Sequence, residues 1–159
     1  MEGRVVSVHG KPLVAGEHGI RKPALDEARI RVSGVEGDSN GHRARKRNND
    51  PDQAVLLLAQ EALAALAEEG WPVAAGDLGE NVLTEGLPLV LEPGRRLAVG
   101  TAILEVTKRC EPCTYLYDLP YVGASRGPAF LKTLVGRRGW YARVVAEGVA
   151  RPGDPITGP

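Results

Sequence analysis

Hydrophobic and polar positions alternate over several short stretches of the chain, a pattern typical of half-buried β-strands. In residues 29–32, Ile30 and Val32 are expected to face one way and the two intervening arginines the other. The valine-rich stretch 4–10, residues 102–109 and residues 140–145 indicate further strands. Short strands of this kind, separated by glycine-containing turns, predict a mainly β fold.

Residues 51–69 carry the strongest helical pattern in the sequence. Apolar side chains recur there at helical spacing, and Asp50 followed by Pro51 resembles a helix start. We therefore expect one long helix from about Pro51 to Glu69. A second, short helix is expected over residues 126–136, where Pro128 lies near the start and Gly136 at the end.

Composition narrows the classes of protein to consider. The 159 residues suit one domain covering residues 1–159, and the 20 glycines and 12 prolines fit short strands joined by tight turns. A formal net charge of zero gives no reason to expect a nucleic-acid or membrane partner. The first ten residues lack the features of a signal peptide, and no stretch approaches a membrane span. We expect a cytoplasmic protein.

The stretch "KRCEPCTYLY" at 108–117 contains both cysteines, Cys110 and Cys113. Two cysteines with three scattered histidines are too few ligands for an ordinary structural zinc site. A thioredoxin-type couple fits the C-x-P-C spacing, but that motif normally opens a βαβ unit, and here it follows a run of strands. Both cysteines could also be small buried apolar residues, which is common for free cysteine.

The position of the two cysteines favours a chemical role. They lie where a strand leads into a turn containing Pro112, and functional residues concentrate at such ends. Lys108 and Arg109 precede them, and neighbouring cations favour a thiolate. A thiolate can bind a transition metal or carry a sulfur atom.

Four stretches together resemble the MOSC domain, which is named for the C-terminal domain of molybdenum cofactor sulfurase. They are "RKPALDEARIRVSGVEGD", "GDLGENVLTEGLPL", "GRRLAVGTAILEVTKRCEPC" and "RRGWYARVVAEGVARPGD". The resemblance runs from about Arg21 to Asp154 and implies a strand-rich MOSC β-barrel with one long helix and a short C-terminal helix. It also implies that Cys113 is the working thiol and that Cys110 accompanies it.

The resemblance implies a molybdenum cofactor (molybdopterin) with Cys113 as the metal ligand and catalytic residue. Such a protein would reduce a small N-hydroxylated substrate with electrons from a separate partner, because the sequence shows no attached reductase segment. Alternatively, Cys113 would take sulfur from a donor and carry it as a persulfide, or the domain would bind a cofactor without turnover. Pyridoxal phosphate belongs to full-length sulfurases, and no lysine motif here supports it.

The remaining candidates are residues suited to holding a polar, anionic pterin near Cys113. Asn81 offers an amide donor and acceptor in a glycine-rich loop, although the same residues would also suit an ordinary turn. Basic residues would contact the phosphate, unless they belong to a solvated loop or an exposed strand face. The expected cofactor-binding residues, in one pocket with Cys113, are Asn81, Lys22, Arg43, Arg45, Lys108 and Arg143.

Overall fold

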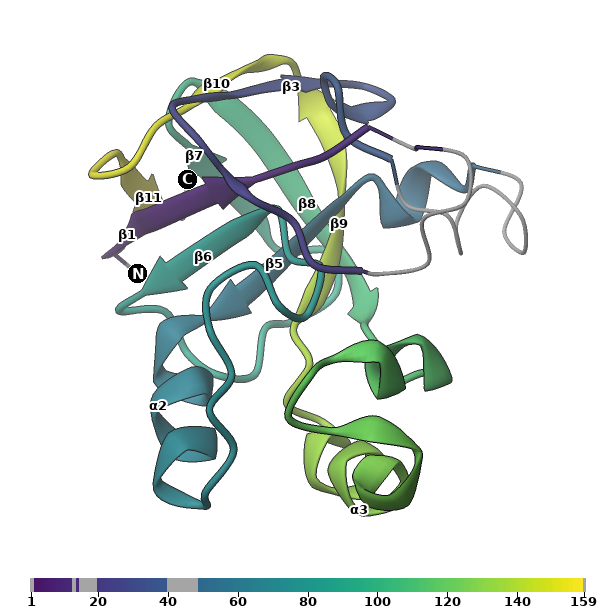
Figure 1. Cartoon of the computed structure of the whole chain (residues 1–159). Helices are drawn as coiled ribbons and strands as arrows, with labels where there is room; N and C mark the ends of the chain where they lie inside the picture. Colours follow the sequence, from purple (N-terminus) through teal and green to yellow (C-terminus); the bar gives the residue numbers. More distant parts are fainter. Residues whose placement is uncertain (1, 13, 15–19, 40–48, 159) are drawn as a thin grey trace.

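A closed barrel forms the body of the protein (Figure 1). The computed structural model describes residues 2–12, 14, 20–39 and 49–158, and within these residues seven strands close the barrel in the order β11-β7-β8-β9-β5-β6-β1. Antiparallel pairing of β1 with β11 completes the ring. The strands are β1 (Glu2–His9), β5 (Val55–Ala59), β6 (Val82–Glu85), β7 (Arg96–Val99), β8 (Ala102–Arg109), β9 (Trp140–Ala146) and β11 (Pro155–Thr157).

Four short strands extend this framework. A two-residue strand, β2 (Ala24–Leu25), pairs with the end of β1, while β3 (Ala28–Arg31), β4 (Gly34–Val35) and β10 (Gly148–Ala150) form a separate sheet. The alternation predicted for residues 29–32 holds only as far as Arg31. Ile30 is fully buried, whereas Val32 lies beyond the strand and is 59% exposed. The strand-rich fold expected from the sequence is confirmed.

The long helix expected over residues 51–69 is wrong in its first half. Residues Pro51–Gln53 form a short 3-10 helix, Val55–Ala59 is strand β5, and only Gln60–Glu68 is helical (α2). Strand β5 pairs with β6 and β9, and both of its faces are buried: Val55 and Leu57 pack in the barrel core, and Leu58 packs in the second core beside the helices. An unbroken apolar run satisfies a fully buried strand as well as a helix, and periodicity alone does not separate the two.

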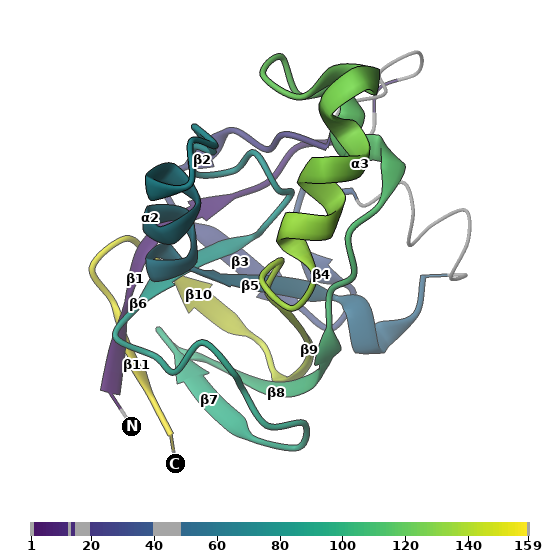
Figure 2. The same ribbon diagram turned by 90° about the horizontal axis from the view of Figure 1, so that it is seen from below.

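Both α-helices lie at the same end of the barrel (Figures 1 and 2). Helix α3 (Gly123–Leu134) follows a 3-10 helix at Thr114–Asp118 and begins three residues before the predicted start, so it is longer than expected and Pro128 lies inside it. A second apolar core, containing Leu66 and Phe130, lies outside the barrel interior and joins α2 to α3. In the described part of the chain, no helix is long and apolar enough to cross a membrane.

Candidate functional site

The two cysteines lie at the end of strand β8, as the sequence predicts. Strand β8 ends at Arg109, and Cys113 immediately precedes the 3-10 helix that leads to α3. Both thiols are free, but their surroundings differ: Cys113 is partly exposed, whereas Cys110 is only 2% exposed.

The side chain that contacts Cys113 is Arg138, which belongs to the short loop before β9. Its Nη1 donates to the Cys113 sulfur at 3.3 Å and to the carbonyl oxygen of Glu111 at 2.8 Å. Its Nη2 donates to the carbonyl oxygen of Leu78 at 3.3 Å. Leu78 belongs to the glycine-rich "GDLGEN" loop, so one guanidinium joins the cysteine turn to that loop.

The charge of Arg138 is unusual because it is buried. The residue is 7% exposed, its Nε has no hydrogen-bond partner, and no carboxylate among the described residues forms an ion pair with it. Burial by itself lowers the pKa of Arg138, but the neighbouring Cys110 and Cys113 sulfurs more than offset this, and the net pKa lies above its usual value. The guanidinium therefore stays charged.

Cys110 is held in a more apolar environment. Its sulfur donates to the Tyr141 hydroxyl at 3.3 Å, and the two side chains pack with Leu56. Burial raises the pKa of the Cys110 thiol, despite the lowering effect of nearby Arg138. Burial therefore favours the neutral thiol at Cys110.

Asn81 is almost fully buried, and protein groups occupy both ends of its amide. Its Oδ1 accepts from the Leu56 backbone at 3.0 Å, and its Nδ2 donates to the Asp38 carboxylate at 2.9 Å and to the His9 carbonyl at 3.2 Å. These contacts join β5, β1 and the turn after β4. Asn81 therefore holds these three segments together and serves as a connector between them.

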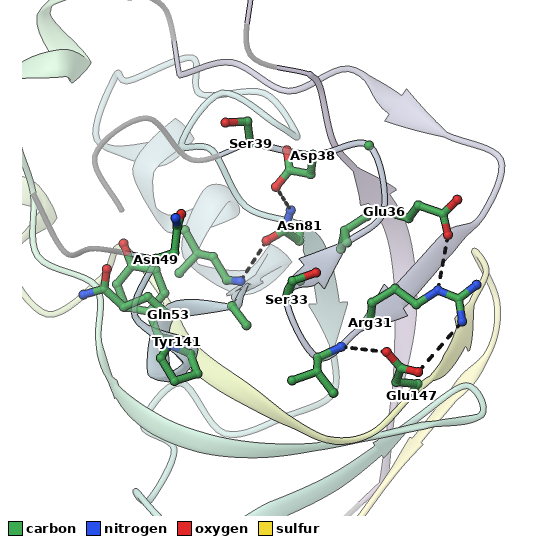
Figure 3. A pocket seen from close by; sticks show the side chains of 17 residues that line it. Arg31, Ser33, Glu36, Asp38, Ser39, Asn49, Gln53, Asn81, Tyr141 and Glu147 are labelled. Carbon is green, nitrogen blue, oxygen red and sulfur yellow. Dashed lines mark hydrogen bonds and ion pairs between the residues drawn. The ribbon is translucent and has the colours of Figure 1, made fainter. Parts of the chain in front are cut away.

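A cavity of about 840 Å³ lies beside this connector (Figure 3). Asn81 and Tyr141 both line it, and Tyr141 in turn contacts Cys110, so the glycine-rich loop borders the cavity directly and the cysteine turn only through Tyr141. Gln53 also lines it; this side chain is 6% exposed and its Oε1 has no partner. Cys113 is not among the described residues of the lining.

The three predicted cations that the structure describes, Lys22, Lys108 and Arg143, form their ion pairs away from Cys113. Lys22 forms a buried ion pair with Asp38 at 2.8 Å, which places it one contact away from Asn81. Lys108 pairs with Asp50 at 3.4 Å, just before the turn that lines the cavity. Arg143 forms an ion pair with Glu105 on an exposed strand face and contacts neither Cys113 nor Asn81. The remaining two candidates, Arg43 and Arg45, lie outside the described residues.

Sequence reasoning missed Arg138, although it belongs to the "GRRGW" stretch. Its neighbour Arg137 points outward and forms an ion pair with Glu69, and nothing in the letters distinguishes the two arginines. The sequence contained one indication that the backbone next to Arg138 is constrained. Gly139 follows Arg138 with a positive φ of 96°, a conformation that favours glycine and that lets the chain pass close to β5.

Glu80, in the same glycine-rich loop, is a second buried ionisable group that sequence reasoning did not single out. It is fully buried; one carboxylate oxygen accepts from the Gly76 backbone at 3.0 Å and the other has no partner. Burial raises the pKa of Glu80, and nearby His9 offsets only part of that rise. Its hydrogen bond with the Gly76 amide holds the two ends of this loop together.

The arrangement combines a partly exposed thiol, a buried guanidinium and a glycine-rich loop. A family model for the MOSC domain matches residues 21–157. The chain belongs to the MOSC domain family. All four sequence motifs that suggest this family lie within the matched residues.

Solved structures of similar shape show that the fold is shared with other proteins. This MOSC domain is similar to the YuaD protein from Bacillus subtilis, with 20% identity and a TM-score of 0.79 over 98% of this chain and 94% of that one. It is similar to YiiM from Geobacillus stearothermophilus, with 26% identity and a TM-score of 0.75 over 99% and 75%. For YiiM from Escherichia coli the values are 23% and 0.71, over 100% and 70%. A comparison with curated proteins finds no match.

Proposed function

We propose that this MOSC protein binds a molybdenum cofactor and that Cys113 supplies a thiolate ligand to the metal. The observation that carries the proposal is the contact of buried Arg138 with both the Cys113 sulfur and the Leu78 carbonyl. Cysteine sulfur is a ligand that transition metals take in proteins, and the guanidinium holds this sulfur in place. The same contact joins the cysteine turn to the glycine-rich loop.

The described residues can hold a molybdenum cofactor through one sulfur ligand, Cys113. Among the described residues, no three histidine, cysteine or acidic side chains gather to form a metal site, so a metal held here would rely on a thiolate and on its own cofactor ligands. The nearby cavity of about 840 Å³ is wide enough for a pterin, and the unpartnered amide oxygen of Gln53 could accept from an N–H group. The bound cofactor would supply a redox-active centre.

The activity we propose is reduction of an N-hydroxylated small molecule. The N–O bond breaks, two electrons and two protons enter, and the products are the amine and water. A separate electron-transfer protein would supply the electrons. Within the chain, Cys113 would hold the metal, Arg138 would orient the sulfur, and Asn81 would keep the loop beside the cavity. Phosphate contacts from Arg43 and Arg45 remain predictions. We infer a cytoplasmic location, where free thiols stay reduced.

A persulfide carrier is the second candidate. It is favoured by the partial exposure of Cys113 and by its position outside the described cavity lining, because a sulfur carrier needs only an accessible thiolate. In this alternative, the Cys113 sulfur would take the outer sulfur atom of a persulfide donor, the S–S bond of the donor would break, and the donor thiol would leave. Arg138 would stabilise the terminal anionic sulfur.

The test is to produce the chain in a host that makes the cofactor and to measure molybdenum and pterin per chain. We expect the wild type and Cys110→Ser to retain both, and Cys113→Ser to lose most of both. Incubation with a sulfur donor that instead adds the mass of one sulfur atom to Cys113, in a protein free of molybdenum, would favour the carrier. Equal loss of molybdenum in both variants would contradict the role assigned to Cys113.

A further inference from the structure

Three buried side-chain atoms in the described part of the chain lack a hydrogen-bond partner: Oε1 of Gln53, Oε1 of Glu80 and Nε of Arg138. Buried polar atoms are normally paired, so each of these needs an explanation. Glu80 and Arg138 are not among the described residues of the cavity lining. Gln53 lines that cavity and is only 6% exposed. Its amide oxygen is therefore available to a group bound in the cavity.

The turn that contains Gln53 is fixed by contacts on its far side. Asp50 caps the 3-10 helix that ends at Gln53 by accepting from the Asp52 amide at 2.9 Å, and Lys108 pairs with Asp50 at 3.4 Å. The Thr107 hydroxyl donates to the Asp52 carbonyl oxygen, which joins the turn to β8. Because the turn is already ordered, the Gln53 oxygen needs little rearrangement to accept from a ligand.

The charged side chains in the described lining pair with protein groups. Arg31 forms ion pairs with Glu36 and Glu147, and Asp38 forms one with Lys22. The group left without a partner is the neutral amide oxygen of Gln53, which can only accept a hydrogen bond. The part of a ligand that meets this oxygen is therefore a neutral N–H donor, and not a phosphate or a carboxylate.

The cavity wall beside Gln53 suits a flat ring. The 3-10 helix packs against β9, and Ala54, Leu56 and Tyr141 line the cavity together with Gln53 (Figure 3). Ligand pockets commonly combine apolar and aromatic walls with a few fixed polar groups that set the orientation of the ligand. A pterin matches this wall, because it is a flat heteroaromatic ring with N–H donors along one edge.

We propose that Gln53 recognises the N–H edge of the cofactor's pterin ring and selects for rings that carry such a donor. The inference deepens the proposed function, on which it rests for the identity of the ring. It also implies a trade-off between stability and binding. Without a ligand the unpartnered oxygen destabilises the fold, so an apolar side chain of similar length should stabilise the chain and weaken ligand binding.

The experiment titrates free pterin, followed by its fluorescence, into full-length protein made in a host that cannot synthesise the cofactor. Dimethyllumazine is the donor-free ligand, because it keeps the bicyclic ring but has methyl groups on the ring nitrogens and an oxygen in place of the amino group. Guanosine presents the N–H edge on a purine instead. The proteins are the wild type, Gln53→Met, Gln53→Glu and a matched control at an exposed glutamine, Gln60→Met.

We expect the wild type to prefer pterin over dimethyllumazine. Gln53→Met should weaken pterin binding about tenfold and leave dimethyllumazine binding unchanged, since only pterin loses a hydrogen bond. Gln53→Glu keeps an acceptor oxygen and should bind pterin more tightly than Gln53→Met, and Gln60→Met should match the wild type. Without ligand, Gln53→Met should melt about 2–4 °C above the wild type, because it removes an unpaired buried acceptor.

The ring comparison separates recognition from a structural role, because a damaged cavity would weaken binding of both rings alike. An equal loss for both rings in Gln53→Met, unchanged pterin affinity in that variant, no saturable pterin binding by the wild type, or tighter binding of guanosine than of pterin would overturn the proposal. If Gln53→Met does not fold, the two rings are compared on the wild type and Gln53→Glu, and equal affinity for both overturns it.

The same titration separates this inference from the proposed function. Free pterin contains no metal, so Cys113→Ser should bind it as the wild type does. A chain that binds pterin through Gln53 but takes up no molybdenum would contradict the metal ligand alone. A chain that retains molybdenum while Gln53→Met leaves pterin affinity unchanged would contradict the role of Gln53 alone.

Discussion

Two buried polar clusters lie near the cavity, and their hydrogen bonds are satisfied to different degrees. One lines the cavity through Asp38 and Asn81, and the other contacts the lining residue Tyr141 through Cys110. One cluster, here the amide cluster, has nearly every donor and acceptor engaged within the protein. The other, the thiol cluster, contains a buried charge without a carboxylate and a nitrogen without an acceptor. The amide cluster consists of Lys22, Asp38 and Asn81, and the thiol cluster of Cys110, Cys113 and Arg138.

The difference indicates that the amide cluster holds the fold together and is not a ligand site. In the amide cluster, the Asp38 carboxylate accepts from Lys22, Asn81 and the Lys11 backbone, which leaves little capacity for a ligand. Buried polar groups in proteins are normally satisfied in this way, and the exceptions need an explanation. The thiol cluster is such an exception, and we propose that metal binding at Cys113 explains it.

Breaking the amide cluster should have the largest effect. Asn81→Ala removes three hydrogen bonds and leaves the Leu56 amide and the His9 carbonyl buried without these partners. We expect a loss of about 3–5 kcal/mol in the free energy of unfolding. Urea unfolding measures it. If the variant keeps its stability but loses molybdenum, Asn81 serves the ligand directly and the contrast between the clusters is wrong.

The approach of the Arg138 loop to β5 should be the next most sensitive feature. A Cβ at Gly139 would lie 2.2 Å from the Leu57 carbonyl oxygen, in a residue with a φ of 96°. Gly139→Ala should therefore cost about 3 kcal/mol and disturb the Cys110 amide, which donates to the Gly139 carbonyl. Gly153→Ala is the matched control, since its φ is 92° with open space around it, and strain alone should cost about 1 kcal/mol. Equal losses would contradict the close approach.

Glu80 provides a test of pH dependence beside the amide cluster. Because burial raises its pKa in the folded protein, its contribution to stability is fully present below the ordinary value of 4.5 and is lost as pH rises through the folded pKa. Glu80→Gln stays neutral at every pH. The melting temperature of the variant relative to the wild type should rise with pH between about 4.5 and 8. A difference that stays constant over this range would show that Glu80 does not ionise as argued.

The exposed ion pair of Arg143 should have the smallest effect. It pairs with Glu105 on the outer face of β8 and β9, and solvent screens such contacts. Arg143→Ala should shift the melting temperature by less than about 2 °C and leave molybdenum content unchanged. A loss of molybdenum in a stably folded variant would restore Arg143 to the cofactor site, as the sequence predicts.

Sequence patterns predicted the strand-rich fold and the motif at the strand end that contains Cys113. Those features depend on local alternation, turn residues and short motifs, which the letters display directly. The sequence did not predict that residues 51–69 divide between a strand and a helix. Val55–Ala59 is apolar on both faces, a pattern that suits a helix as well as a strand, and its pairing with two neighbouring strands determines its conformation.

The site partners could not be inferred in the same way. Arg137 and Arg138 are adjacent and identical in type, and only the packing of the chain leaves Arg137 half-exposed against Glu69 and buries Arg138 against Cys113. Lys108 was chosen for its nearness in sequence to the cysteines, yet its side chain reaches Asp50 instead. Burial and long-range contacts determine these roles, and neither is visible in spacing.

The most direct test of Cys113 as the metal ligand is X-ray absorption at the molybdenum edge, on protein loaded with cofactor. The measurement compares the wild type, Cys113→Ser and Cys110→Ser. The account predicts that Cys113→Ser, in whatever fraction still binds molybdenum, has one sulfur neighbour fewer at the metal, while Cys110→Ser matches the wild type. The same number of sulfur neighbours in Cys113→Ser and the wild type would contradict it.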